Sequence, residues 1–216
     1  MGTGARLSQI AAECLHPSNA VAVWLGPGHV QEFYRGIPNC MVIDSENDDA
    51  KRRLVQAFSS DLIRFYYGGD MIGNEVGAAA KNVVGIAAGF LDGKGLSSLK
   101  GALMSRGTRE VARLIQAMGG SQLSAYGLCH LGDYEATVFS RYSHNRQFGE
   151  SFIRGETYTD LAEGYYTVEA LVLLGQRYGV ELPICQAVHR VLYCGADPMQ
   201  ELRALLDRNL TREFGE

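Results

Sequence analysis

Two periods of apolar residues alternate along the first part of the chain. Short apolar runs, typical of buried strands, lie between segments whose apolar residues recur at helical spacing. The predicted strands cover residues 20–25, 39–45 and 63–69. The predicted helices of this part cover residues 5–15, 29–36 and 51–59, with an acidic loop at 46–50. This alternation predicts an α/β segment, and three strands indicate the end of a larger sheet.

Beyond residue 69 only the helical period continues. The stretch from Glu75 to Gly93 is apolar all round, which predicts a central buried helix. Later helical patterns stop at glycine or start at proline, and both residues mark helix ends. These predicted helices cover residues 97–119, 159–179, 183–195 and 197–210.

The change of period predicts a division of the chain near residues 68–73. Residues 1–70 are expected to form an α/β remnant, because they hold all the strand patterns. Residues 71–216 are expected to form an all-α, multi-helix domain.

Composition and charge argue against several kinds of partner. The chain is 46% hydrophobic and 20% charged, as is ordinary for a globular domain. Its net charge is −4 and its 20 Lys and Arg residues are dispersed, so no nucleic-acid or acidic-membrane surface is predicted. The longest apolar run, residues 71–91, contains Glu75, Lys81 and Asn82, which favours a buried helix over a membrane span. The N-terminus shows no apolar core of signal-peptide length.

Cysteine and histidine spacing gives no sign of a metal centre. The five cysteines include no CxxC pair, and an odd number argues against a disulfide framework. Reduced thiols are typical of a cytoplasmic protein. The five histidines, at positions 16, 29, 130, 144 and 189, lack metal-ligand spacing, and most are expected at the surface or at helix caps.

The stretch "GAAAKNVVGIAAG", residues 77–89, raises the first question of chemistry. Lys81 and Asn82 stand at the centre of an otherwise apolar segment. Such a lysine usually extends its stem over apolar surface and keeps its head in water. Alternatively, a lysine held in a dry site is suited to proton transfer. The stretch by itself favours the first interpretation.

A polar segment at residues 129–149 is the second candidate. It is expected to lie between helices. Its hydroxyl, amide and charged side chains are Asp133, Thr137, Ser140, Ser143, His144, Asn145 and Arg146. One interpretation is a solvated loop that caps neighbouring helices, and the other is a cradle for a phosphate group. The segment alone does not favour either.

Several stretches follow one another in a characteristic order. They read "LGPGHVQEFYRGIP", "GNEVGAAAKNVVGIAAGFLDG", "LMSRGTREVARL", "GLCHLGDYEATVFSRYSHNRQFG" and "AEGYYTVEALVLLGQRYGVELPICQAVHRVLYCGADP". Together they resemble the NAD(P)-dependent glycerol-3-phosphate dehydrogenase family, over about residues 7–210. The most specific parts are the lysine helix and the polar segment, where the family usually reads Gly-Leu-Gly-Asp, then Thr, then Ser-Arg-Asn-Arg.

The resemblance implies a function. It implies interconversion of sn-glycerol 3-phosphate and dihydroxyacetone phosphate by hydride transfer, with NAD or NADP as cofactor. It also implies a Rossmann-type origin for the α/β remnant and a substrate-binding role for the helical domain. A cytoplasmic protein in glycerophospholipid biosynthesis is expected, with a small-molecule substrate, no nucleic-acid or membrane partner, and a homodimer as its assembly.

The resemblance also assigns residue roles. Lys81 would be the catalytic proton donor, and Asp133 would order its ammonium group and the substrate hydroxyl. Glu163 would lie near the nicotinamide end of the cofactor. The implied substrate-binding residues are Asn82, Thr137, Asn145 and Arg146.

Three departures from the family pattern matter. The Gly-x-Gly-x-x-Gly coenzyme half is absent, and so is a family lysine in a Thr-Lys-Gly stretch. His144 stands where the family usually has an arginine that pairs with phosphate, so either Arg141 or Arg146 replaces it or phosphate affinity falls. The chain is therefore expected to begin inside the coenzyme domain, to bind NAD(P) poorly and to turn over weakly or not at all.

Two rival functions stay open. A non-catalytic helical homologue, kept for dimer formation or regulation, fits the missing lysine and His144. A dehydrogenase of similar build that acts on another hydroxy acid is the second rival, and the predicted phosphate cradle argues against it.

Overall fold

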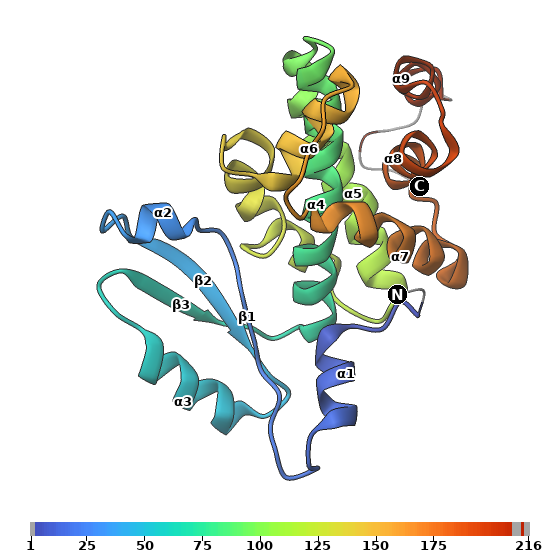
Figure 1. The fold of residues 1–216 in the computed structure, drawn as a ribbon. Coiled ribbons are helices and arrows are strands. Elements are labelled where there is room, and N and C mark those ends of the chain that lie inside the picture. Colours follow the sequence, from blue (N-terminus) through green and yellow to red (C-terminus); the bar gives the residue numbers. More distant parts are fainter. Residues whose placement is uncertain (1–2, 209–212, 214–216) are drawn as a thin grey trace.

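The computed structural model describes residues 3–208 and residue 213. Figure 1 shows a small sheet with helices on it, joined to a larger group of helices. The predicted order, an α/β segment followed by helices, is confirmed. The predicted boundary near residues 68–73 stays a prediction, although the long central helix begins close by, at Met71.

The sheet has the strand order β1-β2-β3. β1 runs antiparallel to β2, with Trp24 opposite Ile43, and β2 runs parallel to β3, with Met41 opposite Phe65. Ile43, Phe65 and Val55 of the neighbouring helix form its small core. The strands are β1 Val23–Leu25, β2 Asn39–Asp44 and β3 Ile63–Tyr67.

The helix that covers this sheet, α3 (Asp48–Phe58), begins earlier than predicted. The acidic stretch 46–50 was expected to be a loop, and this was wrong for its second half. The Asn47 side chain accepts a hydrogen bond from Ala50 N at 2.8 Å, which caps the helix. Asp48 and Asp49 then lie in the first turn, where negative charge is stabilised.

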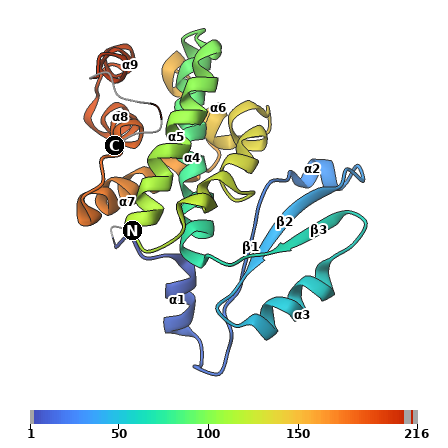
Figure 2. The same cartoon turned by 180° about the vertical axis from the view of Figure 1, so that it is seen from behind.

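Helices α5, α6, α7 and α8 pack against α4, as Figures 1 and 2 show from opposite sides. α4 begins where the Asp70 side chain accepts from Gly73 N at 3.0 Å. It buries Val83 and Ile86 completely, as an all-round apolar helix should. The helices are α1 Leu7–Cys14, α2 Val30–Phe33, α4 Met71–Gly93, α5 Lys100–Ala117, α6 His144–Arg154, α7 Glu163–Tyr178, α8 Pro183–Cys194 and α9 Pro198–Leu206.

The segment predicted to be polar and non-helical, residues 129–149, is largely helical. It holds a short turn η3 (Leu131–Asp133), a π-helical turn η4 (Glu135–Phe139) and the start of α6. The Ser143 hydroxyl caps α6 by accepting from Arg146 N at 3.3 Å. The prediction missed α6 because its buried positions, Asn145 and Gly149, are not apolar.

Other helix ends differ less from the predicted ones. α7 begins at Glu163 rather than at residue 159, and α9 ends at Leu206. Residues 209 and 210, predicted as its last turn, lie outside the described residues. Within the described part of the chain, no helix is both long and apolar enough to cross a membrane.

Asp44 joins the sheet to the helical part. It ends β2 and is almost completely buried. Its Oδ2 accepts from Asp70 N at 2.9 Å and from Asn74 Nδ2 at 2.8 Å, and both residues lie at the start of α4. This contact fixes α4, and the residues that α4 carries, relative to the sheet.

Candidate active site

Lys81 and Asp133 form an ion pair between α4 and the η3 turn. Lys81 Nζ donates a hydrogen bond to Asp133 Oδ2. The Lys81 side chain is 20% exposed, whereas the Asp133 side chain is only 2% exposed. A buried carboxylate therefore holds an amine that still reaches solvent.

Burial dominates the electrostatics of Asp133. Removal from water raises the pKa of the Asp133 carboxyl above its ordinary value. The charge and hydrogen bond of Lys81 oppose this rise in pKa, and the Thr137 hydroxyl opposes it through a hydrogen bond. The negative charge of Asp133 thus depends on its neighbours, which makes the pair sensitive to small displacements.

A chain of amide hydrogen bonds runs beside the pair and joins three helices. Asn82 Nδ2 donates to Glu163 Oε2 at 2.9 Å, and Asn145 Nδ2 donates to Asn82 Oδ1 at 3.1 Å. Asn145 Oδ1 in turn accepts from Gly164 N at 2.8 Å. A backbone N–H can only donate, so it fixes the orientation of the Asn145 amide and, through it, that of Asn82.

The predicted site residues therefore fall into two groups. Lys81, Asp133 and Thr137 are in contact, and Asn82, Asn145 and Glu163 form the adjoining chain. Their roles stay predictions.

Arg146 lies in a separate charge cluster. Its Nε donates to Asp92 Oδ2 at 2.5 Å, and its Nη2 lies 3.4 Å from Glu150 Oε2. Lys100 Nζ also donates to Asp92, at 2.6 Å. Burial raises the pKa of Asp92, but hydrogen bonds from Lys100, Ser97 and Arg146 outweigh it and lower the pKa.

His29 is a residue of the site that the sequence prediction missed. Among buried side-chain nitrogen and oxygen atoms of the described residues, only its Nε2 has no hydrogen-bond partner. Its ring contacts Tyr142, with centroids 5.5 Å apart, and a positive charge on it would lower the pKa of the Asp133 carboxyl. One feature of the sequence could have pointed to His29: it directly follows Gly26-Pro27-Gly28, within a stretch that resembles the family.

His130 is the other missed residue. Most histidines were expected at the surface or at caps, but His130 is completely buried. It lies three residues before Asp133, and its contacts are described below.

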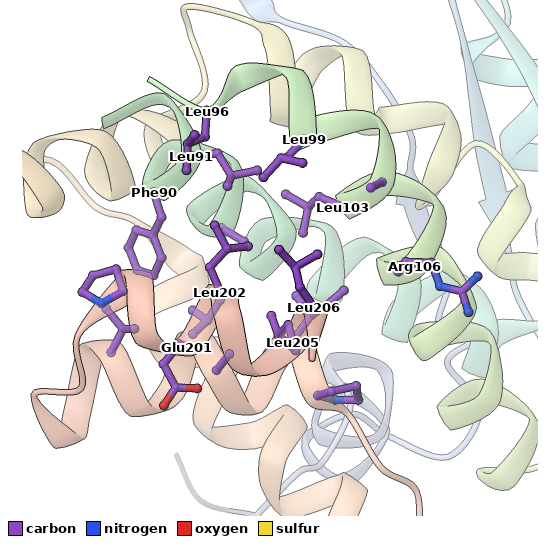
Figure 3. A pocket seen from close by; sticks show the side chains of 18 of the residues that line it. Phe90, Leu91, Leu96, Leu99, Leu103, Arg106, Glu201, Leu202, Leu205 and Leu206 are labelled. Atoms are coloured by element: carbon purple, nitrogen blue, oxygen red, sulfur yellow. The ribbon is translucent and has the colours of Figure 1, made fainter. Parts of the chain in front are cut away.

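The apolar groove in Figure 3 lies elsewhere. It has a volume of about 250 Å³ and lies between α4, α5, α8 and α9. Neither Lys81 nor Asp133 lines it. Arg106 extends at its rim and is exposed. The groove is lined mainly by Phe90, Leu91, Leu96, Leu99, Leu103, Leu202, Leu205 and Leu206.

Among residues 3–208 and 213, no three His, Cys, Asp or Glu side chains are grouped as a metal ion would require. All five cysteines, which lie in the same part, have free thiols.

The fold and the ion pair define a class of protein. A helical domain beside the end of an α/β sheet carries a lysine–carboxylate ion pair whose carboxylate is buried. A sequence model described as "NAD-dependent glycerol-3-phosphate dehydrogenase C-terminus" matches residues 70–203. The chain belongs to the NAD-dependent glycerol-3-phosphate dehydrogenase family.

Relatives with that name are similar over nearly the whole chain. The glycerol-3-phosphate dehydrogenase [NAD(P)+] of Thermus thermophilus is 42% identical over 217 residues, which are 97% of this chain and 66% of that protein. The protein of the same name from a Thermotoga species is 37% identical over 220 residues, covering 98% of this chain and 67% of that one. The chain thus spans about two thirds of the length of these relatives.

A solved structure has the same fold. The glycerol-3-phosphate dehydrogenase of Coxiella burnetii superposes with a TM-score of 0.89 at 31% identity, over 95% of this chain and 65% of that one. The predicted fold class, the end of an α/β sheet followed by an all-helical domain, is confirmed.

Proposed function

We propose that this chain carries the substrate site and the proton-transferring lysine of an NAD(P)-dependent glycerol-3-phosphate dehydrogenase. The reaction interconverts sn-glycerol 3-phosphate and dihydroxyacetone phosphate. One observation carries the proposal: a partly exposed ammonium group, Lys81, is held by an almost fully buried carboxylate, Asp133. In the Lys100–Asp92 pair both side chains are only 7% exposed, whereas the Lys81 amine keeps enough exposure to meet a ligand.

Lys81 acts as the proton donor when the ketone is reduced. Bound NADH or NADPH supplies the hydride that reaches C2 of dihydroxyacetone phosphate. The Lys81 ammonium group gives its proton to the C2 oxygen, which becomes the secondary hydroxyl of glycerol 3-phosphate. Asp133 keeps the amine oriented, and the 20% exposure of Lys81 lets it regain a proton from water. Oxidation of glycerol 3-phosphate follows the same proton path in reverse.

Polar groups around the pair fit a small phosphate ester. The unpartnered Nε2 of His29 suits a substrate hydroxyl, because a buried polar atom normally has a partner. Thr137, Asn82 and Asn145 supply further hydroxyl and amide groups. Arg146 uses Nε and Nη2 on Asp92 and Glu150, which leaves Nη1 as the group to meet a phosphate.

The N-terminal end of α7 fits the nicotinamide end of the cofactor. A nicotinamide carries a carboxamide whose N–H groups need acceptors. Glu163 is exposed there, and among the residues that the structure describes its carboxylate is bonded only at Oε2, by Asn82. Glu163 Oε1 would hold the carboxamide, and the amide chain behind it would fix the carboxylate.

The test of this proposal is turnover by the purified protein. Dihydroxyacetone phosphate and NADH or NADPH are supplied, and loss of the reduced coenzyme is followed by absorbance. Because the sequence holds no Gly-x-Gly-x-x-Gly coenzyme motif, we expect weak turnover at most in the wild type and in a Lys94→Met control, which removes an exposed lysine. Lys81→Met should lose it. Absence of turnover in a wild-type protein that binds both ligands would contradict the proposal.

A ligand series separates the two rival functions. Glycerol 3-phosphate should raise the melting temperature, because a ligand that binds only the folded state stabilises it. Glycerol and lactate should not. A non-catalytic homologue predicts no shift with any of them, and a dehydrogenase of another hydroxy acid predicts a shift with lactate.

A homodimer and a cytoplasmic location are further parts of the proposal. Both rest on the family resemblance. Light scattering of the purified protein measures the assembly directly, and a monomer at micromolar concentration would contradict the dimer.

A further inference from the structure

His130 links the two elements that carry the Lys81–Asp133 pair. The imidazole is 0% exposed, and both of its ring nitrogens are bonded. Nδ1 lies 2.8 Å from the carbonyl oxygen of Gly77, and Nε2 lies 2.7 Å from the Tyr134 hydroxyl. A carbonyl oxygen only accepts, so Nδ1 carries the proton, and Nε2 accepts from Tyr134.

The first bond reaches the turn of α4 that presents Lys81. In an α-helix the carbonyl of residue i accepts from the N–H of residue i+4. Gly77 stands four residues before Lys81, so its carbonyl is the helical partner of the Lys81 N–H. His130 therefore bonds to the same oxygen atom that holds the Lys81 backbone. Its Cβ also packs against this turn, 3.0 Å from where a Cβ on Gly77 would lie.

The main chain of His130 holds Asp133. Its carbonyl accepts from Asp133 N at 3.0 Å, which closes the η3 turn. One residue thus contacts the backbone of the lysine's turn through its side chain and the carboxylate's turn through its carbonyl.

The network behind His130 has no contact with solvent. Tyr134 is also 0% exposed, and its hydroxyl accepts from Thr108 Oγ1 at 3.4 Å. His130 stands at the position of the first glycine in the family pattern Gly-Leu-Gly-Asp. A glycine has no side chain, so the family pattern does not supply the bond between His130 and the Gly77 carbonyl of α4.

We propose that His130 is a positioning residue, which sets the separation of Lys81 and Asp133 by joining their two turns through the Gly77 carbonyl. The inference rests on the proposed function for its catalytic consequence, but the positioning itself does not depend on turnover. It predicts that loss of the bond to Gly77 changes the pairing of Lys81 with Asp133. Loss of the bond to Tyr134 should lower only the free energy of unfolding.

Three variants separate the two bonds. His130→Asn places an amide nitrogen at the position of Nδ1 and keeps the Gly77 bond. His130→Gln places its amide at the position of Nε2, which keeps the Tyr134 bond and loses the Gly77 bond. Tyr134→Phe also keeps the Gly77 bond and loses the other. All three remain polar or similar in volume at a buried site, and melting temperatures show whether each is folded.

The first measurement is amine labelling of the protein, read by mass spectrometry. The chain has only four lysines, Lys51, Lys81, Lys94 and Lys100, so each can be followed separately. In His130→Gln we expect Lys81 to react several-fold faster relative to Lys94, because its pairing with Asp133 loosens. In His130→Asn and Tyr134→Phe the ratio should stay close to wild type, even where the melting temperature falls. Labelling that follows melting temperature across all three variants would overturn the inference.

The second measurement is kinetic. With glycerol 3-phosphate and NAD(P), His130→Gln should lower kcat by about tenfold with little change in KM, because misplaced reacting groups slow the chemical step. His130→Asn should restore kcat. If the wild type binds both ligands and shows no turnover, the proposed function fails, and the labelling experiment still decides the inference. Wild-type turnover with equal kcat in the Gln and Asn variants would overturn the inference alone.

Discussion

Lys81 and Asp133 depend on each other for their charges. Asp133 is buried enough that its pKa is raised even with the ammonium group beside it. Removing the amine leaves a buried carboxylate without a counter-charge, and a broken buried pair is strongly destabilising. The carboxyl can relieve this cost by taking up a proton, so the cost depends on pH.

Lys81→Met tests this dependence. Turnover should fall by about 10²–10⁴-fold, the range for loss of an acid–base group. The free energy of unfolding should fall at neutral pH, by about 3–5 kcal/mol. The raised pKa of Asp133 favours its neutral form, so the loss should shrink as pH falls from neutral toward the ordinary value of 3.8. Denaturant unfolding measures this. Adding Asp133→Asn should restore stability without turnover, and a pH-independent loss in Lys81→Met would contradict the argument.

His144 is the residue whose replacement should improve phosphate binding. It is exposed, and its Nδ1 lies 2.8 Å from the Tyr158 hydroxyl. A guanidinium offers a fork of donors where a neutral imidazole offers one. His144→Arg should therefore lower KM for glycerol 3-phosphate by about tenfold, with kcat nearly unchanged, since a hydrogen bond to a charged group contributes about 1.5–3 kcal/mol.

A matched control for this change is His16→Arg, which adds the same charge at another exposed position. It should leave KM unchanged. Equal effects of the two substitutions would mean that overall charge, and not a contact at His144, determines affinity.

At the scale of elements, the site depends on how closely α4 and α6 approach. A Cβ on Gly89 of α4 would collide with the backbone of α6 at Arg146 and would lie 2.7 Å from Glu150 N. Backbone cannot move as a side-chain end can, so the two helices would have to separate. The link between Asn82 and Asn145 crosses the same interface.

Gly89→Ala should therefore lower the free energy of unfolding by about 1–3 kcal/mol, the usual cost of overpacking. The matched control is Gly101→Ala, within helix α5, where a new Cβ meets nothing within 4 Å. That change should stabilise the protein by about 0.5–1 kcal/mol, because alanine is the better helix former. Thermal denaturation compares them, and equal destabilisation by both would show that the close approach is unimportant.

Elements with a clear apolar period were predictable, and elements packed through polar residues were not. The α4 and α5 patterns identified the core because their buried residues are mostly apolar or small. α6 was missed because Asn145 and Gly149 are its buried positions. Periodicity reports which residues avoid water, and a buried amide with partners on two other helices avoids water without being apolar.

The candidate site was predictable in part. A lysine inside the apolar stretch 77–89 was visible from the residues alone, whereas Asp133 as its partner came only from family resemblance. His130 could not be found either way, because its role depends on a carbonyl 53 residues away. Contacts of this length are set by the packing of whole elements.

At the scale of the whole molecule, buried titratable groups act on stability with opposite signs. Burial raises the pKa of Glu110, which accepts hydrogen bonds from Ile184 N and Cys185 N at the start of α8. A carboxyl with a raised pKa loses stabilising effect as pH rises through the raised value. His130 behaves oppositely: burial lowers its pKa from 6.5 to about 4, against a smaller opposing effect of the Gly77 bond. The overall pH profile of the wild type therefore combines both trends.

Comparison of wild type with His130→Asn isolates the histidine. The unfolded chain takes up a proton at His130 below pH 6.5, while the folded chain resists until about pH 4. The contribution of His130 to stability is present above pH 6.5 and falls as pH drops. The advantage of wild type over the Asn variant should therefore shrink by about 3 kcal/mol between pH 7 and pH 4, because each pH unit between the two pKa values contributes about 1.4 kcal/mol. Cys129, Asp133 and Tyr134, the titratable neighbours of His130 in the sequence, are present in both proteins, so their contributions largely cancel in the difference. Urea unfolding at intervals between these pH values measures the free energy of unfolding of both proteins. If the two free energies changed in parallel with pH, His130 would gain a proton in the folded chain as easily as in the unfolded one.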